Sequence, residues 1–410
     1  MSVAGPIERI GIVGLGLVSP LGNAAETAWG RLMNGETAIR RWSCEGLPDI
    51  PAASAEFDVS PQLNKLQQVG TERVSQMALV AARNALDDAG VEGWEDPEKV
   101  GLYVGTGMGG ASTVDLGYAA LYGGRRIPPL TVPAGMVNGA AAVVALHTGI
   151  RGPVLTYAVA CASSAVAIAE AAHALRRGEV DVAVAGGVEA LLVRGTVAAW
   201  HALRTLAPPD EADIGRSCRP FSAKRSGLVL GEGSAFLVLR RESDVARQAR
   251  APHAWLAGSA VRCDATHLTN PDVRGQVATL RAALAASQLT PADIGYCNAH
   301  GTGTMAGDPV ECEAVRQVWT DAAPDLLVSS TKAAHGHLLG AAGALEALWT
   351  VQSLRTGEVP PTQGVDDIDP ACRGMAHVLQ TGRRYPHLRH AISNSFAFGG
   401  TNATLVFSKA

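Results

Sequence analysis

The chain has 410 residues, of which 47% are hydrophobic and 18% are charged, and its formal net charge is −4. This length exceeds what one hydrophobic core usually supports, so we expect two core units. A weakly acidic chain is not expected to bind nucleic acid, and no apolar run reaches the ~18 to 20 residues that span a membrane. Because Met1–Ile10 lacks a basic region followed by an apolar stretch, we predict no signal peptide and a cytoplasmic protein.

The seven cysteines argue against a disulfide or zinc framework. Their number is odd and no CxxC occurs, so neither a disulfide scaffold nor a structural zinc site is predicted. In a reducing compartment we expect most of them to be buried thiols. They are Cys44, Cys161, Cys218, Cys263, Cys297, Cys312 and Cys372.

The first predicted strand, Ile10–Val13, runs into a Gly-rich turn that is not a dinucleotide-binding fingerprint. Ser19 stands where the third glycine should be, and Pro20 and Gly22 interrupt the helix that should begin there. Residues 105–110 lack the rest of a phosphate-binding pattern, and the chain contains no GxxxxGK[ST]. We therefore predict no nucleotide cofactor.

Helix and strand patterns then occur in pairs along the chain. Residues 78–91 have a helical pattern and precede a strand at 101–104, while residues 277–289 have a helical pattern and precede a strand at 294–297. Both strands continue into Gly/Thr-rich turns. This alternation of helices and strands predicts an α/β fold with largely parallel strands.

A second pair places a helix directly after the tip of a strand. The strand at 154–160 leads into a small-residue helix at about 162–177. In the same way, the strand at 326–330 leads through a turn into a helix near 338–354. In both places the last residues of a strand are predicted to lie at the N-terminus of a helix.

The third pair is a direct echo within the sequence. Residues 228–239 align without gaps on residues 396–407, with four identities and a glycine at the bend between two strands. Three pairs in the same order predict a duplicated α/β unit. We place the N-terminal half at 1–248 and the C-terminal half at 249–410, with the break in the charged segment 240–252.

Cys161 is the candidate nucleophile because it follows a strand tip in the small-residue sequence Ala160-Cys161-Ala162-Ser163. The unpaired N–H groups and the positive end of the helix dipole favour a thiolate at such a position. The alternative is a buried structural cysteine, which is the usual role of a lone Cys.

His300 lies in the segment Asn-Ala-His-Gly-Thr-Gly-Thr, with Asp308 and Glu311 following as supporting acids. An imidazole at the end of a strand can donate a hydrogen bond to a developing oxyanion. The hydroxyls of Thr302 and Thr304 can bind a ligand that carries amides. Asp308 is also predicted to cap the next helix. The alternative is an ordinary Gly-rich turn with a structural histidine.

Lys332, His335 and His337 form a third cluster. His337 lies at a predicted helix start, where the helix dipole disfavours the imidazolium ion, and a neutral imidazole can still donate one hydrogen bond. The two histidines offer only two ligands, and no acidic or cysteine cluster is close in sequence, so no metal site is predicted. Structural turn histidines are the alternative.

Near the C-terminus, Phe396 and Phe398 flank Ala397 and precede the pair Gly399-Gly400. Two aromatic residues beside two glycines can form a mobile backbone element next to a pocket. The alternative is a hairpin with a packed aromatic core.

Taken in chain order, these motifs resemble those of one family. A Cys at a strand-to-helix turn is followed by His-Gly-Thr-Gly-Thr, by Lys…Gly-His-Leu-Leu-Gly-Ala-Ala-Gly and by Asn-Ser-Phe-x-Phe-Gly-Gly-Thr-Asn. Over residues 9–408 the order is similar to that of the type II β-ketoacyl-acyl carrier protein synthases, condensing enzymes of the thiolase superfamily. The resemblance implies a thiolase-like fold, in which a duplicated α/β unit forms α-β-α-β-α layers.

The resemblance implies decarboxylative Claisen condensation in fatty-acid, polyene or polyketide elongation, with no metal or cofactor. Cys161 would take an acyl group from the phosphopantetheine thioester of an acyl carrier protein. Backbone N–H groups of Cys161 and Phe398 would form the oxyanion hole. When malonyl-carrier protein loses carbon dioxide, His300 and His337 would donate hydrogen bonds to the enolate oxygen. The carbanion would then attack the acyl group on Cys161.

The same resemblance gives other residues supporting roles. Lys332, paired with Glu346, would set the electrostatics of the site, and Phe398 would gate it. Thr302 and Thr304 would contact the pantetheine arm, and Met108 would line the acyl pocket. The residues implied to contact substrate are Thr302, Thr304, Met108 and Phe396.

Four positions depart from the family pattern. Ala397 stands where glycine is usual, which would stiffen the loop. His335 takes a place often held by Thr, and Ser222 and Ser226 replace common acidic residues. These departures leave the acyl substrate open, with polyene or polyketide assembly among the alternatives.

An acidic carrier protein is expected to dock on a basic rim. The family is usually dimeric, so a homodimer, or a heterodimer with a related subunit, is also implied. The alternative is that the rim residues are solvated charges without a role. The candidates are Lys65, Arg73, Arg125, Arg126 and Arg204.

Two other functions are alternatives to an elongating enzyme. A non-elongating partner subunit, such as a chain-length factor, typically lacks the nucleophilic cysteine. A thiolase-type or starter-unit enzyme that uses coenzyme A typically pairs Cys with His and Asn. The presence of Cys161 together with His337 disfavours both.

Overall fold

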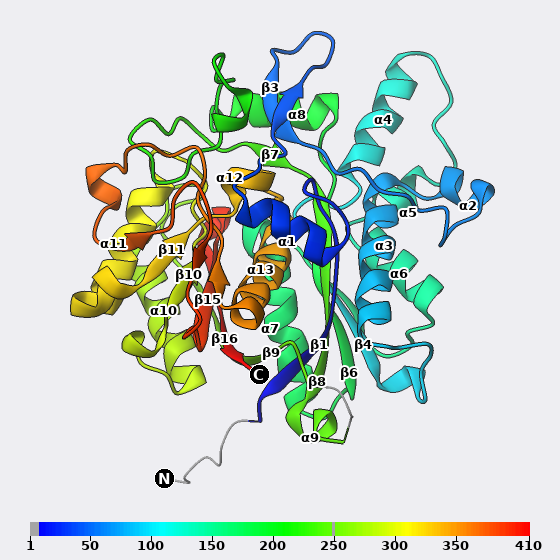
Figure 1. Cartoon of the computed structure of the whole chain (residues 1–410). Coiled ribbons are helices and arrows are strands. Elements are labelled where there is room, and N and C mark those ends of the chain that lie inside the picture. The colour runs from blue at the N-terminus through cyan, green and yellow to red at the C-terminus, as the bar shows by residue number, and fades with distance from the viewer. Residues whose placement is uncertain (1–7, 248–250) are drawn as a thin grey trace.

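A single large sheet connects the two halves of the sequence. The computed structural model describes residues 8–247 and 251–410 (Figure 1), and in these ranges eleven strands form one sheet. From edge to edge the strands are β13 (Ala376–His377), β11 (Leu327–Ser329), β10 (Tyr296–Asn298), β15 (His390–Phe396), β16 (Thr401–Lys409), β9 (Ala254–Cys263), β1 (Ile10–Val18), β8 (Gly233–Arg241), β6 (Val182–Glu189), β4 (Val100–Gly105) and β5 (Val154–Tyr157).

The pairing pattern of one half of this sheet is repeated in the other. β1 is antiparallel to β8 and β8 is antiparallel to β6, whereas β6, β4 and β5 are parallel. β9, β16, β15, β10 and β11 repeat this pattern in the same order. The two halves join where residues 10–12 of β1 pair with residues 254–256 of β9. The predicted duplicated α/β unit is therefore confirmed.

Helices form three layers around the two halves of the sheet (Figure 1). One outer layer packs on the N-terminal half, a central layer lies between the halves, and another outer layer packs on the C-terminal half. This is the predicted α-β-α-β-α arrangement. In the same order the helices are α3 (Arg73–Asp88) and α6 (Gly139–Thr148), then α7 (Ser163–Arg176) and α13 (Ala342–Thr356), then α10 (Val273–Ser287) and α11 (Gly307–Trp319).

The two central helices are rich in small residues because sheet strands cover them on both sides. Every residue of α13 from Ala342 to Leu354 is buried, and α7 buries Ser163 to Ala169 without interruption. A helix with no solvent-facing side needs no polar stripe, and small side chains let it pack closely between two layers. This packing fixes the N-termini of both helices, which lie at the candidate site.

Shorter elements surround this framework. None of the helices in the described ranges is long and apolar enough to cross a membrane. A three-stranded sheet (β2, β3, β7) and a two-stranded sheet (β12, β14) lie apart from the main one. The remaining helices and strands are α1 (Ala25–Met33), β2 (Arg40–Trp42), β3 (Ile50–Ala53), α2 (Lys65–Gly70), α4 (Ala111–Tyr122), α5 (Thr131–Gly135), α8 (Arg194–Ala202), β7 (Leu230–Gly231), α9 (Glu242–Val245), α12 (Lys332–His335), β12 (Glu358–Val359) and β14 (Arg383–Arg384).

The sequence echo has a direct structural meaning. Gly233 and Thr401, which the echo aligns with each other, are the first residues of β8 and β16. The predicted division into 1–248 and 249–410 stays a prediction, because its boundary falls at residues 248–250, outside the described residues. One helix start differs from expectation: the helix predicted from residue 338 begins at Ala342, after a tight turn over Leu339–Ala341.

Candidate active site

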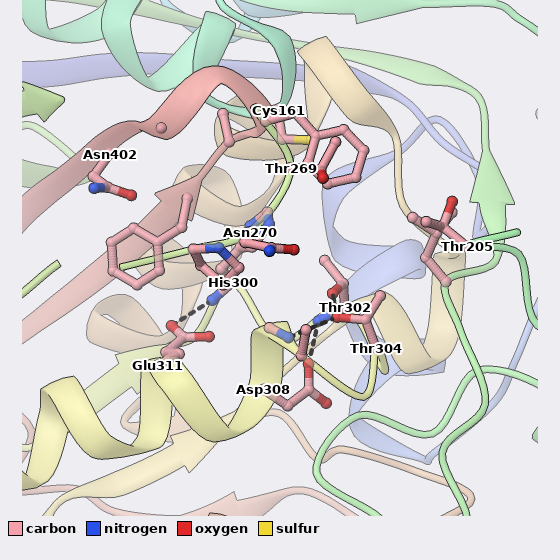
Figure 2. Close-up of a pocket in the computed structure, with 18 of the residues that line it drawn as sticks. Cys161, Thr205, Thr269, Asn270, His300, Thr302, Thr304, Asp308, Glu311 and Asn402 are labelled. Atoms are coloured by element: carbon pink, nitrogen blue, oxygen red, sulfur yellow. Dashed lines mark hydrogen bonds between the residues drawn. The ribbon is translucent and has the colours of Figure 1, made fainter. Parts of the chain in front are cut away.

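A cavity of about 190 Å³ opens where several strands of the sheet end. Cys161 follows β5, His300 follows β10, and His337 follows α12, which itself comes after β11. Ligands in α/β folds bind at the carboxyl ends of parallel strands, where loops from separate strands converge. The lining includes Cys161, His300, Thr302 and Thr304, which Figure 2 labels. His337, Phe396 and Phe398 also line the cavity.

Cys161 lies in a sharp turn, Ala160–Ala162, between β5 and α7. Ala160 has φ +49°, in the left-handed region that non-glycine residues rarely adopt, and this turn brings Cys161 to the N-terminus of α7. Cys161 is 7% exposed. Its sulfur lies 3.0 Å from Nε2 of His337 and accepts a hydrogen bond from the backbone N–H of Phe398.

The predicted resting thiolate is not what the structure gives. Burial raises the pKa of Cys161 to about 12, although Lys332 and the Phe398 amide both lower it. Desolvation therefore outweighs the neighbouring positive charge and the hydrogen bond. The resting group is therefore a thiol.

His337 is held in one tautomer. The backbone N–H of Leu339 donates to Nδ1 at 3.3 Å, so the ring proton lies on Nε2, the atom that faces the sulfur of Cys161. Burial, followed by the charge of Lys332, lowers the pKa of His337 well below its usual value. From the sequence we expected the helix dipole to keep the His337 ring neutral, but in the structure the main cause of the lowered pKa is burial.

The loop that carries His300 is fastened by two buried carboxylates from α11. Glu311 accepts the backbone N–H groups of His300 and Gly301, both at 2.8 Å. Asp308 accepts those of Thr302 and Gly303, both at 3.1 Å. Figure 2 shows both acids on the yellow helix below this loop. They support the loop through its backbone.

Asp308 differs from its predicted place in the helix. It was expected to cap α11, but α11 begins at Gly307, with Ala306 as its N-cap. The Asp308 carboxylate instead turns back to the loop and also accepts the N–H of Phe221 at 2.8 Å. Burial raises its pKa to about 6.

Lys332 and Glu346 form the ion pair that the resemblance implied. Both side chains are completely buried, and Nζ of Lys332 donates to the Glu346 carboxylate and, at 2.5 Å, to the carbonyl oxygen of His300. Burial raises the pKa of Glu346 to about 7, against the lowering effect of Lys332. The pair thus connects α12, α13 and the His300 loop beneath the cavity.

The sulfur of Cys161 and one nitrogen each of His300 and His337 lie within 4.8 Å of one another. The two imidazole rings meet edge to face, with centroids 5.4 Å apart. Three such atoms match a zinc ligand set in type, but a proton on Nε2 of His337 blocks that atom as a ligand. The absence of a resident metal stays a prediction. The His337 tautomer with its proton on Nε2 favours that absence.

Two family models together match most of the chain. The model for the β-ketoacyl synthase N-terminal domain matches residues 7–245, and that for the C-terminal domain matches residues 253–366. The chain belongs to the β-ketoacyl synthase family. Nodulation protein E of Rhizobium sp. (strain N33) is 38% identical over 98% of this chain and 99% of its own. The 3-oxoacyl-[acyl-carrier-protein] synthase 2 of Rhizobium meliloti (strain 1021) is 36% identical over the same shares.

Solved structures agree with this assignment. The ishigamide ketosynthase/chain length factor has a TM-score of 0.90 and 27% identity, covering 98% of this chain and 99% of its own. A type II PKS acyl-carrier protein in complex with its ketosynthase gives a TM-score of 0.90 and 25% identity over 99% and 100%. The predicted thiolase-like fold and the predicted acyltransferase class are confirmed: this is a condensing enzyme of fatty-acid or polyketide elongation.

Phe398 of this β-ketoacyl synthase has an aromatic partner that sequence reasoning missed. Its ring stacks on Trp200 of α8, with centroids 6.3 Å apart and 23° between the planes, and Trp200 also lines the cavity. Phe396 lies against His300, with ring centroids 6.2 Å apart. No local pattern marks Trp200, because its only signal is a contact between segments almost 200 residues apart.

The departures from the family pattern fit this synthase without strain. Ala397 has φ −105° and ψ 155°, an ordinary extended conformation, so alanine suits the position. His335 is buried; its Nδ1 donates to the carbonyl of Gly336 at 2.8 Å, and Thr331 lies 3.1 Å from its Nε2. Burial lowers the pKa of His335 to about 3, so the ring is neutral. Ser222 is buried and Ser226 is exposed.

Other predicted substrate residues lie in different surroundings. The hydroxyls of Thr302 and Thr304 are 3.1 Å apart on the cavity wall, where a ligand can reach them. Met108 lies outside that lining and is 43% exposed. Its predicted role in the acyl pocket stays a prediction.

The five candidate rim cations are all exposed, but one has a structural partner. Arg73 pairs with Glu232, a carboxylate that is only 4% exposed, and its guanidinium lies over the ring of Phe57. Arg204 directly precedes Thr205, a cavity-lining residue. The other three rim cations are Lys65, at the start of α2, and Arg125 and Arg126, after α4.

Proposed function

We propose that this synthase elongates acyl chains in two steps on Cys161. In the first step the sulfur attacks the thioester of an acyl carrier protein, the acyl group moves to sulfur, and the thiol proton leaves with the pantetheine thiol. The Nε2–H of His337 and the N–H of Phe398 stabilise the sulfur as negative charge develops. The 3.0 Å contact between Cys161 and His337 carries this proposal.

In the second step malonyl-carrier protein loses carbon dioxide and leaves an enolate. His300 and His337 are both neutral because burial lowers their pKa values, so each can donate one hydrogen bond to the enolate oxygen. The enolate carbon attacks the acyl carbonyl on Cys161, and the N–H groups of Cys161 and Phe398 hold the resulting oxyanion. Collapse releases the β-ketoacyl thioester and a Cys161 thiolate, which takes a proton from solvent.

We further propose that an acyl carrier protein delivers both substrates, without a cofactor, in the cytoplasm. A structural neighbour is an acyl-carrier protein in complex with its ketosynthase, and another is a ketosynthase/chain length factor, which supports a dimer with a copy of this chain or with a related subunit. All seven cysteines are free, which suits a reducing compartment.

The docking surface for the carrier protein is tested by reversing an adjacent pair of charges. Arg125→Glu with Arg126→Glu should raise the KM for acyl-carrier protein because carrier proteins are acidic. The exposed pair Arg383 and Arg384 is the matched control. An unchanged KM for acyl-carrier protein in Arg125→Glu/Arg126→Glu would refute the docking proposal.

The reaction is tested by intact-mass analysis of wild type and Cys161→Ala. Each is incubated with a panel of acyl-carrier proteins and then with malonyl-carrier protein. Wild type should gain an acyl mass that malonyl-carrier protein discharges as a β-ketoacyl product, and the alanine variant should gain none. The acyl chain that loads best identifies the substrate.

The same experiment separates the two alternatives. If wild type is never acylated, a partner-subunit role becomes the better account. If acyl-CoA loads Cys161 with release of CoA and no carrier protein, a CoA-dependent starter enzyme is favoured. The buried Cys161, His300 and His337 cluster supports the elongating enzyme over both.

A further inference from the structure

Glu189 is a buried carboxylate that the proposed reaction does not use. It ends β6 and has no exposed surface, and within the described residues no basic side chain pairs with it. Its oxygens accept the backbone N–H groups of Gly107 at 2.6 Å, Met108 at 3.2 Å and Gly340 at 2.9 Å. Several N–H donors favour the ionised form, although burial still raises the pKa of Glu189 to about 7.

The two backbone segments that Glu189 binds touch each other directly. A Cβ atom on Gly340 would lie 2.1 Å from the nitrogen of Gly107, and one on Gly187 would lie 2.6 Å from the oxygen of Gly105 and 3.0 Å from that of Gly340. Side chains are therefore excluded from this junction. Glu189 is the shared hydrogen-bond acceptor of segments 107–108 and 340, which come from different halves of the sequence.

The second segment contains the group that sets the tautomer of His337. Leu339, the residue before Gly340, donates its N–H to Nδ1 of His337 and has φ +46°. Leucine adopts this left-handed conformation only where its surroundings hold it there. The hydrogen bond from Gly340 to Glu189 lies on the next amide and restrains the turn.

We propose that Glu189 is a positioning residue that, through Gly340 and Leu339, keeps the ring proton of His337 on Nε2. The inference rests on the proposed function, because this proton matters only if His337 donates to the Cys161 sulfur and then to the enolate oxygen. Without Glu189 the turn relaxes, and His337 loses both its orientation and its fixed tautomer. Cys161 keeps the Phe398 amide and its place at the start of α7, so its acylation slows but still goes to completion.

The test variant is Glu189→Gln, which keeps the shape but replaces one acceptor oxygen by an NH₂ group that cannot accept from the amides. The enzyme is first acylated on Cys161 and isolated, and then mixed with malonyl-carrier protein in a single turnover. Carbon dioxide release should slow by about 10- to 100-fold, as is usual when the group that orients a catalytic side chain is removed. Acylation should still go to completion.

A direct readout is ¹⁵N NMR of the histidine rings. In wild type the His337 signals, identified by their loss in His337→Ala, should show a proton on Nε2 alone. In Glu189→Gln they should show exchange between the two nitrogens. A purely structural role for Glu189 would not move the proton on this ring.

Two further variants keep the test sharp. Glu72→Gln is the matched control, because Glu72 is a partly buried carboxylate in the same half that accepts hydrogen bonds from Thr113 and Ser75, and it should leave carbon dioxide release unchanged. Glu189→Asp keeps the charge but is too short to bind both segments. Glu189→Asp should therefore show the same slow carbon dioxide release and the same His337 signals as Glu189→Gln. It replaces Glu189→Gln in the test if that variant fails to fold.

The outcomes are distinguishable. If the Glu189 variants release carbon dioxide as fast as Glu72→Gln, or if the His337 signals match wild type, the proposal is overturned. If wild type is never acylated or never decarboxylates, the proposed function fails instead. The NMR comparison then still decides whether Glu189 fixes the tautomer.

Discussion

The buried pair of Lys332 and Glu346 allows stability and catalysis to be separated in one set of variants. Both side chains have zero exposure, and Lys332 also donates to the carbonyl of His300. Removing one partner of a buried ion pair leaves an uncompensated charge and typically costs about 3–5 kcal/mol. Glu346→Leu should therefore lower the free energy of unfolding by about that amount.

The loss in the free energy of unfolding for Lys332→Met should lie at the low end of this range of about 3–5 kcal/mol. The reason is that burial raises the pKa of Glu346 to about 7 even with Lys332 present. Without Lys332 the carboxyl can take a proton near neutral pH and avoid a buried charge. The double variant Lys332→Met/Glu346→Leu leaves no charge at all. The free energy of unfolding of this double variant should be within about 1 kcal/mol of the wild-type value or above it.

The assay is urea unfolding followed by tryptophan fluorescence, since Trp349 is buried in α13 one turn from Glu346. Single-turnover carbon dioxide release is measured in parallel. Lys332→Met and the stable double variant should both be slow, because in each the His300 loop loses the donor that Lys332 supplies. A double variant as unstable as the sum of the single ones would refute the reasoning.

Three more changes test separate contacts. Burial raises the pKa of Cys161 to about 12, so its alkylation by iodoacetamide, followed by peptide mass, should keep rising from about pH 7 to about pH 10. Trp200→Ala removes the ring stacked on Phe398, so isolated acyl-enzyme should hydrolyse several-fold faster as water enters. Arg73→Ala leaves the buried carboxylate of Glu232 without its partner and should lower the free energy of unfolding in urea by about 1–3 kcal/mol.

Each of these expectations has an outcome that contradicts it. A plateau in the alkylation rate near neutral pH would mean that the positive end of the α7 dipole lowers the pKa of Cys161 more than burial raises it. Trp200→Phe keeps an aromatic ring and should hydrolyse like wild type; equal rates in the Ala and Phe variants would remove the stacking argument. Arg125→Ala is the control for Arg73→Ala, because Arg125 is exposed and forms no ion pair within the described residues. Equal stability of these two variants would show that Glu232 needs no partner.

The sequence by itself determined the architecture and indicated the candidate reacting groups, because both depend on local patterns. The echo between residues 228–239 and 396–407 predicted a turn between two strands in each half and a duplicated unit, and in the structure β8 and β16 start at positions that the echo aligns. A cysteine after a strand tip and two histidine motifs marked Cys161, His300 and His337 as candidates, and the resemblance to the family, carried by the order of all the motifs, favoured catalytic over structural roles. A strand tip followed by a helix forces such residues to one end of a sheet.

The tertiary structure alone decided how these groups are tuned. The sequence predicted a thiolate at Cys161 from one helix end, but burial by segments distant in sequence raises the pKa of the thiol instead. It predicted a helix from residue 338, whereas packing holds Leu339 in a left-handed turn. The contacts of Trp200 with Phe398 and of Arg73 with Glu232 join residues more than 150 positions apart. Desolvation and such long-range contacts arise only when the chain is packed, so no local pattern records them.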